Sequence, residues 1–349
     1  SYPWIPDWSR FRAIADAVGA YLLADVSHIA GLIAGKAVPS PVGHAHVITF
    51  TTHKTLCGPR GACILTTDSA LAKKIDKAVF PGEQGGPHVH VFAALATTFR
   101  IAASAQFSNL QKQILKNCLA LTDQLQQRGL RISFGGTDSH LGNIDCKTIK
   151  GPDGTALSGD MAARILDIAG IVVNRNTIPG DKTALFASGI RYGTPWLTQR
   201  GFTEEDMRTI GNIMADVLLA ITPYTIDMRK GPSQRAKVDF AVLEQSKIKI
   251  RELAEKAGTD QAYKQSGYPH FYYVDDKAKN KGKYAALNLK GQRIRHFVDY
   301  CFTSDTENLV TGQTQPTELR TPAKTIKGAL TLLEGERYQF IFPPEDFGM

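Results

Sequence analysis

The chain has 349 residues, a formal net charge of +8 and a hydrophobic content of 43%. This length exceeds one ordinary domain, and the composition is typical of a globular protein with a sizeable core, so two or three domains are expected. No stretch reaches the roughly 18 consecutive apolar residues that a membrane-spanning helix needs, and Ser1–Asp7 lacks the basic-then-apolar pattern of a signal peptide. We therefore expect a soluble, cytoplasmic protein.

The cysteines and the positive charge narrow the possible kinds of protein further. The five cysteines are an odd number without a CxxC pair, which supports neither a disulfide framework nor a zinc site. The positive excess is local, because residues 221–300 hold 16 Lys and Arg against 9 Asp and Glu, which leaves 25 against 24 elsewhere. That segment has no RNA-binding aromatic signature, zinc finger or repeated basic helix. We expect a solvated surface there, or one that attracts an anionic small molecule, rather than a nucleic-acid site.

Apolar spacing predicts an α/β sheet domain in the first part of the chain. A helix is expected over Asp7–Val18, capped by Asp7 and ended by Gly19. Buried parallel strands are expected at Tyr21–Val26 and His46–Thr51, and an antiparallel strand at Ala62–Thr66 after a tight turn. Helices should follow around Leu71–Val79, Val89–Ala105 and Leu110–Gln127. Ligands bind beyond the carboxyl ends of parallel strands, which is where Asp25 and Lys54 lie.

A second αβ pattern runs from about Leu130 to Leu219. It contains an expected helix at Asp160–Ala169, a strand at Ile171–Val173 and a long helix from Thr203. Beyond Ile221 the composition shifts to Pro, Lys, Arg and Ser, with a short charged helix around Val242–Lys256 and short strands after it. We expect a domain boundary near 225. The sequence contains neither an internal repeat nor a low-complexity tract.

The run Thr51–Gly61 gathers groups that suit an anionic cofactor. It places hydroxyls, an imidazole, an amine and a guanidinium around glycines that let a backbone approach a ligand. A cofactor aldehyde needs a primary amine, and desolvation and nearby cations make a lysine nucleophilic near neutral pH. Lys54 is the candidate amine, and Asp25 could keep an electron-sink pyridine ring protonated. Taken alone, these would be a surface lysine and a turn aspartate.

Two histidine pairs have the spacing of metal ligands. His44 and His46, or His88 and His90, would share one face of a strand. No carboxylate or cysteine completes a ligand set near either pair, so we expect no metal site. Cys57 and Cys63 are interpreted as packing thiols.

Five segments resemble successive signatures of the serine hydroxymethyltransferase family. Three surround the residues above: Asp25–Leu32, Thr51–Gly61 and Val79–Pro87. Two more, Val173–Asn176 and Ser188–Pro195 with the following Thr198, Arg200 and Gly201, resemble the family's folate-side and substrate-carboxylate segments. The order and spacing agree over residues 1 to about 220, which argues strongly against coincidence.

The resemblance implies a fold-type-I transferase that uses pyridoxal 5'-phosphate. Its α/β architecture would be a three-layer αβα large domain and a smaller αβ domain, followed by a partial α+β tail. The implied reaction interconverts serine and tetrahydrofolate with glycine and 5,10-methylenetetrahydrofolate, as part of one-carbon metabolism and amino-acid biosynthesis. The resemblance assigns Lys54 as the Schiff-base lysine, Asp25 to the pyridinium nitrogen, His28 to the side of the cofactor's phenolic oxygen, and Arg191 to the amino-acid carboxylate through two parallel hydrogen bonds.

Other positions receive supporting roles from the same resemblance. Thr51 and His53 would assist the exchange of lysine for substrate, and Arg60 would add positive field near the cofactor. Gly85 and Gly86 resemble the backbone that reaches the cofactor phosphate of a neighbouring subunit, which implies a homodimer with shared sites. Asn176 and Phe186 resemble folate contacts, although the loop Thr183–Phe186 is one residue shorter than the family pattern. The basic segment would suit a polyglutamylated folate.

The resemblance also implies that the chain begins within the large domain. The family's general acid/base glutamate, a tyrosine near the substrate, the aromatic partner of the cofactor ring and part of the phosphate cradle are expected upstream of Ser1. Residues 1–349 alone are therefore expected to be inactive.

The tail from about Tyr268 resembles a different family. Gly291–Asp299, Thr303–Asp305, Leu309 and Gly312–Thr317 are similar to the early folate-binding part of the glycine-cleavage T-protein, an aminomethyltransferase. On that alignment Asp305 falls at the catalytic aspartate of that family, and the alternative is a turn aspartate before a polar loop.

These expectations divide the chain into four parts. They are the carboxy-terminal part of the PLP-binding large domain at 1–105, a small αβ domain at 106–222, a basic linker with a short helix at 223–262, and a partial T-protein-like folate-binding module at 263–349. One alternative is another fold-type-I aldolase such as threonine aldolase, which tetrahydrofolate dependence of serine turnover would separate. The other is a non-catalytic binding or regulatory homologue, against which the set of Lys54, Asp25, His28 and Arg191 argues. Neither nucleic acid nor a membrane is expected as a partner.

Overall fold

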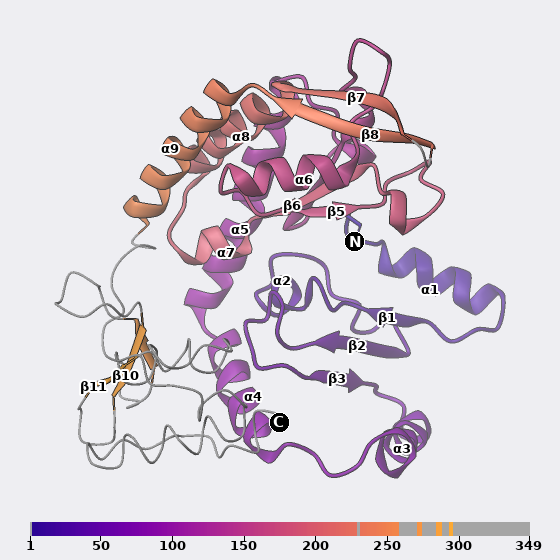
Figure 1. The fold of residues 1–349 in the computed structure, drawn as a ribbon. Helices are drawn as coiled ribbons and strands as arrows, with labels where there is room; N and C mark the ends of the chain where they lie inside the picture. The colour runs from indigo at the N-terminus through magenta and orange to yellow at the C-terminus, as the bar shows by residue number, and fades with distance from the viewer. Residues whose placement is uncertain (1, 229–230, 258–270, 274–283, 288–292, 296–349) are drawn as a thin grey trace, which may run out of the picture. The chain divides into compact units, whose positions relative to one another are not determined.

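A computed structural model describes residues 2–228, 231–257, 271–273, 284–287 and 293–295, and the chain forms two compact units, 1–257 and 258–349 (Figure 1). In the second unit, β9 (Phe271–Tyr273), β10 (Tyr284–Leu287) and β11 (Arg293–Arg295) form an antiparallel sheet in the order β11-β10-β9. Most of the tail that resembles the T-protein, Asp305 included, lies outside the described residues.

The first unit begins with a helix and a three-stranded sheet. α1 (Trp8–Ala17) is capped by Asp7, whose carboxylate accepts a hydrogen bond from the Arg10 amide at 3.0 Å. The sheet contains β1 (Leu23–Asp25), β2 (Val47–Thr51) and β3 (Ala62–Leu65) in that order. β1 is parallel to β2, and β3 is antiparallel to it, which confirms the predicted directions. β1 is shorter than the expected strand at Tyr21–Val26.

One long helix connects this sheet to the rest of the unit. After α2 (Ala30–Ala34), α3 (Ser69–Lys77), the π-helical turn η1 (Ala78–Glu83) and α4 (Val89–Ala102), the chain enters α5 (Ala105–Gln127). Ser104 caps α5, so the helix begins five residues before the predicted start at Leu110. The buried face of α5 contacts α2 and α4 near its beginning and α8 (Glu204–Leu219) further along.

A second sheet forms beside the later part of α5. It contains β4 (Leu141–Asp145), β6 (Gly189–Gly193) and β5 (Asn174–Asn176) in the order β4-β6-β5, and both pairs are antiparallel. Its companions are α6 (Gly159–Ile168), α7 (Pro195–Gln199), α8 and the 3-10 turns η2 (Ser133–Gly135), η3 (Cys146–Thr148) and η4 (Ala184–Phe186). Apolar residues from α5, α6, α8 and this sheet form the larger of two core clusters, and the smaller one lies around β1, β2 and α2.

The predicted strand at Ile171–Val173 is wrong. Ile171 is buried as the chain leaves α6, whereas Val172 is 82% exposed. The ladder begins instead at the polar Asn174, because Asn174 is the residue that pairs with Arg191 of β6. The helices expected at Asp160–Ala169 and from Thr203 are confirmed, the second with Thr203 as its cap.

The segment expected to be a basic linker is structured for most of its length. β7 (Ile221–Met228) and β8 (Gly231–Val238) form a hairpin, and α9 (Phe240–Lys256) includes the helix predicted at Val242–Lys256. α9 packs on α8, its Leu243 joins the larger core cluster, and Lys256 forms an ion pair with Asp206 at 2.9 Å. The first unit therefore continues to Ala257 rather than ending near 225. Within the described residues, we find no helix both long and apolar enough to cross a membrane.

Candidate functional site

A serine hydroxyl joins the carboxyl ends of the two parallel strands. The Ser27 hydroxyl donates to Asp25 Oδ1 at 2.5 Å and accepts a hydrogen bond from the Thr51 amide at 3.1 Å. The Ser27 amide also donates to Asp25 Oδ1, at 3.0 Å. These hydrogen bonds, with the positive charge of Lys54 adding to them, lower the pKa of Asp25. An ionised, exposed carboxylate therefore stands at this edge of the sheet.

The residue after Lys54 anchors the lysine-bearing loop. The Thr55 hydroxyl donates to the His28 carbonyl at 2.8 Å and accepts from the Gly31 amide at 3.0 Å, while Gln111 Nε2 of α5 donates to the Thr55 carbonyl at 3.1 Å. A Cβ atom on Gly31 would lie 2.0 Å from the Thr55 carbonyl oxygen, so this approach requires glycine. Lys54 itself is exposed, on a loop held against both α2 and α5.

The imidazoles of His28 and His140 stack on one another. The ring centroids of His28 and His140 are 5.8 Å apart and their planes are inclined by 22°. Burial lowers the pKa of His28 to about 4, assisted by the positive charges of Lys54 and Arg191 and opposed by Asp25. Burial also lowers the pKa of His140 to about 3, with His28, Arg191 and Lys54 acting in the same direction. Both imidazoles are therefore neutral at physiological pH.

Arg191 occupies the middle of β6, beside Asn143 on β4 and Asn174 on β5. Its Nη2 atom donates to Asn174 Oδ1 at 3.3 Å. Partial burial lowers the pKa of Arg191 from its ordinary value, although the group stays protonated. Its neighbours Ile190 and Tyr192 belong to the larger core cluster. The alternation of a strand therefore presents Arg191 on the opposite face, away from that core.

Three further predicted residues lie on or near the lysine loop. Thr51 ends β2 and is tied to Ser27, as described above. His53 Nδ1 is buried and has no hydrogen-bond partner within the described part of the chain. Arg60 is exposed. The structure thus brings Thr51, His53 and Lys54 together by chain continuity, with one imidazole nitrogen left unsatisfied.

The remaining predicted residues lie further along the chain. Gly85 and Gly86 are in an exposed turn between η1 and α4, and a Cβ atom on either would meet nothing within 4 Å. Asn176 ends β5 and donates from Nδ2 to the Thr177 carbonyl at 2.8 Å. Phe186 is 77% exposed in η4. No contact among the described residues brings these four to Lys54.

Sequence reasoning missed Ser27, Thr55, Gln111 and His140. Ser27 and Thr55 adjoin predicted residues, so a search for hydroxyls next to Asp25 and Lys54 would have found them. Gln111 is a fully buried amide on the mostly apolar buried face of α5, and such an interruption is a usable signal. His140 precedes β4, which was not predicted because Gly142 and Asn143 interrupt its apolar pattern.

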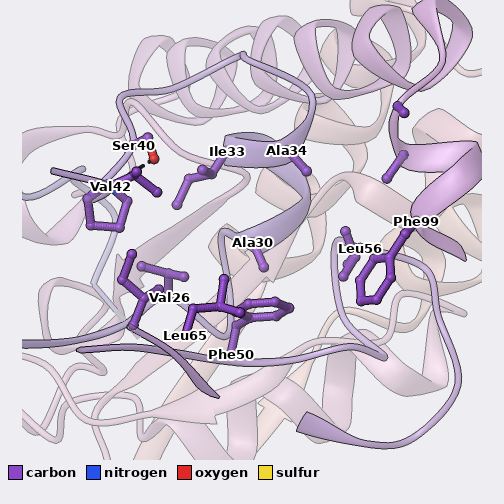
Figure 2. A pocket seen from close by; sticks show the side chains of 14 residues that line it. Val26, Ala30, Ile33, Ala34, Ser40, Val42, Phe50, Leu56, Leu65 and Phe99 are labelled. Carbon is purple, nitrogen blue, oxygen red and sulfur yellow. Dashed lines mark hydrogen bonds between the residues drawn. The ribbon is translucent and has the colours of Figure 1, made fainter. Parts of the chain in front are cut away.

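An apolar cavity of about 350 Å³ lies apart from these polar residues. Figure 2 shows side chains from the sheet, α2 and the loop after it lining this space, together with Leu56 and Phe99. Ser40 is its one polar lining residue, and Lys54, Asp25, His28 and Arg191 are not part of the lining. The cavity thus lacks groups for binding an anion or for proton transfer.

The described residues offer neither a metal-ligand cluster nor a reactive cysteine thiol. They contain no group of three or more His, Cys, Asp or Glu side chains that could hold an ion. Burial raises the pKa of both Cys118 and Cys146 to about 12, and desolvation also raises the pKa of Cys57 and Cys63. Cys57 is exposed, so the packing role expected for it is wrong. These four thiols are free and protonated at neutral pH.

Comparisons with known proteins cover the part of the chain that holds these residues. The sequence pattern of the family described as "Serine hydroxymethyltransferase" matches residues 1–214. Proteins named serine hydroxymethyltransferase from Nostoc punctiforme and Rickettsia akari are 47% identical over 221 residues and 48% identical over 219 residues. A third, from Rippkaea orientalis, is 48% identical over 221 residues. These matches cover 62–63% of this chain and 50–51% of the relatives, so the chain spans about half the length of the curated relatives it matches.

Proposed function

Because this chain belongs to the serine hydroxymethyltransferase family, we propose that it acts in the pyridoxal-phosphate-dependent interconversion of serine and tetrahydrofolate with glycine and 5,10-methylenetetrahydrofolate. Family membership gives it the fold-type-I class, and the α/β arrangement of α1–α8 and β1–β6 is consistent with that class. The observation that carries the proposal is the stack of His28 on His140, which brings the segment after Asp25 to the sheet that bears Arg191.

The residues present fit the cofactor. Pyridoxal phosphate supplies an aldehyde for a lysine amine and a ring that accepts electrons when its nitrogen is protonated. Lys54 is exposed for covalent attachment, and Asp25 is exposed and ionised, as a partner for a protonated ring nitrogen must be. The neutral His28 can share a hydrogen bond with a phenolic oxygen. The unsatisfied His53 Nδ1 is a further polar group that a bound ligand would supply with a partner.

Arg191 is proposed to hold the carboxylate of the amino acid. A guanidinium forms two parallel hydrogen bonds with a carboxylate, which fixes both the position and the orientation of the substrate. Asn174 already accepts a hydrogen bond from one Nη atom, which restricts the arginine rotamer. In the proposed arrangement, a substrate held by Arg191 would be presented to the amine of Lys54.

The other assignments complete the proposal. Thr51 and His53 would assist the exchange of lysine for substrate, and Arg60 would strengthen the positive field. Gly85 and Gly86 would approach the cofactor phosphate of a second subunit in a homodimer.

Asn176 and Phe186 would contact tetrahydrofolate as co-substrate. The tail, with Asp305, would add a T-protein-like folate-binding module. We also propose a cytoplasmic location and a division of the first unit between a large-domain part at 1–105 and a smaller domain that begins at 106.

Cofactor attachment and serine turnover test the proposal together. The full chain is incubated with pyridoxal phosphate, reduced with borohydride and digested, and the modified peptide is identified by mass spectrometry. We expect the label on Lys54. Because residues 1–349 alone are expected to be inactive, serine turnover is assayed after the upstream part of a relative is joined before Ser1, and there we expect serine-to-glycine conversion that requires tetrahydrofolate. A label on another lysine would contradict the assignment, and cleavage independent of tetrahydrofolate would favour a threonine-aldolase-like enzyme.

A further inference from the structure

His140 lies in the candidate site, although neither the predicted residue set nor the proposed reaction uses it. Its side chain is buried, with 6% of its surface exposed, and its ring stacks on that of His28. A centroid separation of 5.8 Å lies in the range in which aromatic rings attract one another. Ser139 Oγ lies 3.1 Å from His140 Nδ1, and the Ser139 amide donates to Thr137 Oγ1 at 3.0 Å. The imidazole is thus held in a fixed orientation from its own loop.

The two histidines lie next to strands of different sheets. His28 follows β1, where the Thr55 hydroxyl fixes its carbonyl, and His140 directly precedes β4. The His140 carbonyl accepts a hydrogen bond from the Thr194 amide at 3.1 Å, just beyond the end of β6. The stack therefore joins the loop that carries the proposed cofactor residues to the sheet that carries Arg191.

The charges around the stack favour a neutral pair. The positive charges of Lys54 and Arg191 disfavour protonation of either ring. The negative charge of Asp25 favours protonation of His28. A neutral His140 exerts no charge repulsion on His28, so its effect on that ring comes from contact and from the exclusion of water.

We propose that His140 is a positioning residue, whose ring fixes the orientation of His28 and shields it from water. The proposal rests on the function given above, because the orientation of His28 matters through its contact with the cofactor. The effect requires a planar ring at position 140. Phenylalanine at that position should therefore preserve the orientation and shielding of His28, and alanine should not. His140 acts through His28 and does not itself contact substrate.

The test follows the His28 ring in the full chain with and without pyridoxal phosphate. The nine histidines are labelled with 13C, and His28→Gln assigns the His28 Hε1 signal. His140→Ala, His140→Gln and His140→Phe are compared with His44→Ala, a half-buried histidine whose hydrogen bonds are made by its backbone. Cofactor affinity is measured from the absorbance of the bound cofactor, and thermal melting shows that each variant is folded.

In the parent chain, the pKa of His28 should be near 4. It should rise toward its ordinary value in His140→Ala and His140→Gln, because water reaches the ring, and stay low in His140→Phe and His44→Ala. Cofactor affinity should fall about three- to tenfold in the first two variants and be retained in the others. If His140→Ala does not fold, His140→Gln alone decides.

An unchanged His28 pKa in the variants that lack a ring would overturn the proposal, and so would loss of the low pKa in His140→Phe. Failure of the parent chain to bind pyridoxal phosphate would count against the proposed function. The titration of His28 without cofactor would still decide whether His140 positions it.

Discussion

The Ser27 hydroxyl oxygen lies 2.5 Å from Asp25 Oδ1, and it also accepts a hydrogen bond from the Thr51 amide. Asp25→Asn should leave this local network largely in place, because the amide oxygen can still accept from Ser27. It removes the negative charge that would stabilise a protonated ring nitrogen. We expect Asp25→Asn to bind the cofactor, measured by cofactor absorbance, and to lose the serine-to-glycine conversion of the chain that is joined to the upstream part of a relative. Turnover equal to that of the parent chain would contradict the role of Asp25.

Lys54→Ala should abolish the borohydride-reducible link to the cofactor, because no primary amine remains at that position. Lys54→Arg, which keeps the positive charge but cannot form the link, should behave in the same way. Lys73→Ala on α3 changes an exposed lysine and serves as the control, with labelling unaffected. Persistence of the label in Lys54→Ala would show that another amine carries the cofactor.

Arg191→Ala should weaken serine binding by on the order of 2–4 kcal/mol, because a partly buried charge-assisted carboxylate contact is lost. Arg191→Lys should recover only part of this, since an ammonium cannot make the two parallel hydrogen bonds. Binding is measured from the change in cofactor absorbance as serine is added. Arg164→Ala removes an exposed arginine of α6 and should leave the serine affinity unchanged. Equal affinities for Arg191→Ala and Arg164→Ala would rule out the clamp.

Acid should destabilise the fold through the buried His140. Its pKa is about 3 in the folded chain and ordinarily 6.5, so the unfolded chain binds the proton more readily. The neutral ring contributes its full stability above pH 6.5, and that contribution is lost as the pH falls toward 3. The side chain in His140→Phe has no proton to bind. The loss of unfolding free energy between pH 7.5 and pH 4.5 should therefore be smaller in this variant by on the order of 3 kcal/mol. The check is urea unfolding at pH 7.5 and pH 4.5, where identical pH dependence in both chains would refute the expectation.

Asn117→Ala should destabilise the first compact unit. The fully buried amide of Asn117 donates to Thr198 Oγ1 at 2.9 Å and to the Phe202 carbonyl at 2.8 Å, which joins α5 to the region around α7. Leaving these acceptors unsatisfied should cost about 1–3 kcal/mol in the free energy of unfolding. The neighbouring exposed Lys116→Ala is the control, and urea midpoints provide the comparison. A midpoint for Asn117→Ala equal to that of the control would be inconsistent with this role.

The fold was predictable where local pattern and burial coincide. The apolar runs before Asp25 and Lys54 predicted β1, β2 and their parallel pairing, and the tight turn after Gly58 predicted the antiparallel β3. β4 was missed because Gly142 and Asn143 break its apolar run, and the strand at Ile171–Val173 was misplaced because pairing with β6 selects Asn174 instead. The β7–β8 hairpin was missed because its prolines and basic residues resemble a linker.

The candidate site was predictable in its chemistry but not in its contacts. Lys54, Asp25, His28 and Arg191 carry functional groups that a motif preserves at fixed spacing. The stack of His140 on His28 depends on two sheets meeting in space, and no spacing along the chain encodes it. Gln111 likewise reaches Thr55 across 56 positions of sequence. Such residues are found only when the tertiary structure is known.

The helix α5 has a mechanical consequence for the site. It runs for 23 residues, a rod about 35 Å long. Near its start Gln111 holds the lysine loop, and further along the Thr122 hydroxyl hydrogen-bonds with Tyr192, the residue after Arg191, at 2.8 Å. The residues next to Lys54 and Arg191 are thus both hydrogen-bonded to one helix. A hinge motion that separated the lysine loop from β6 would have to bend α5 or break one of these two hydrogen bonds.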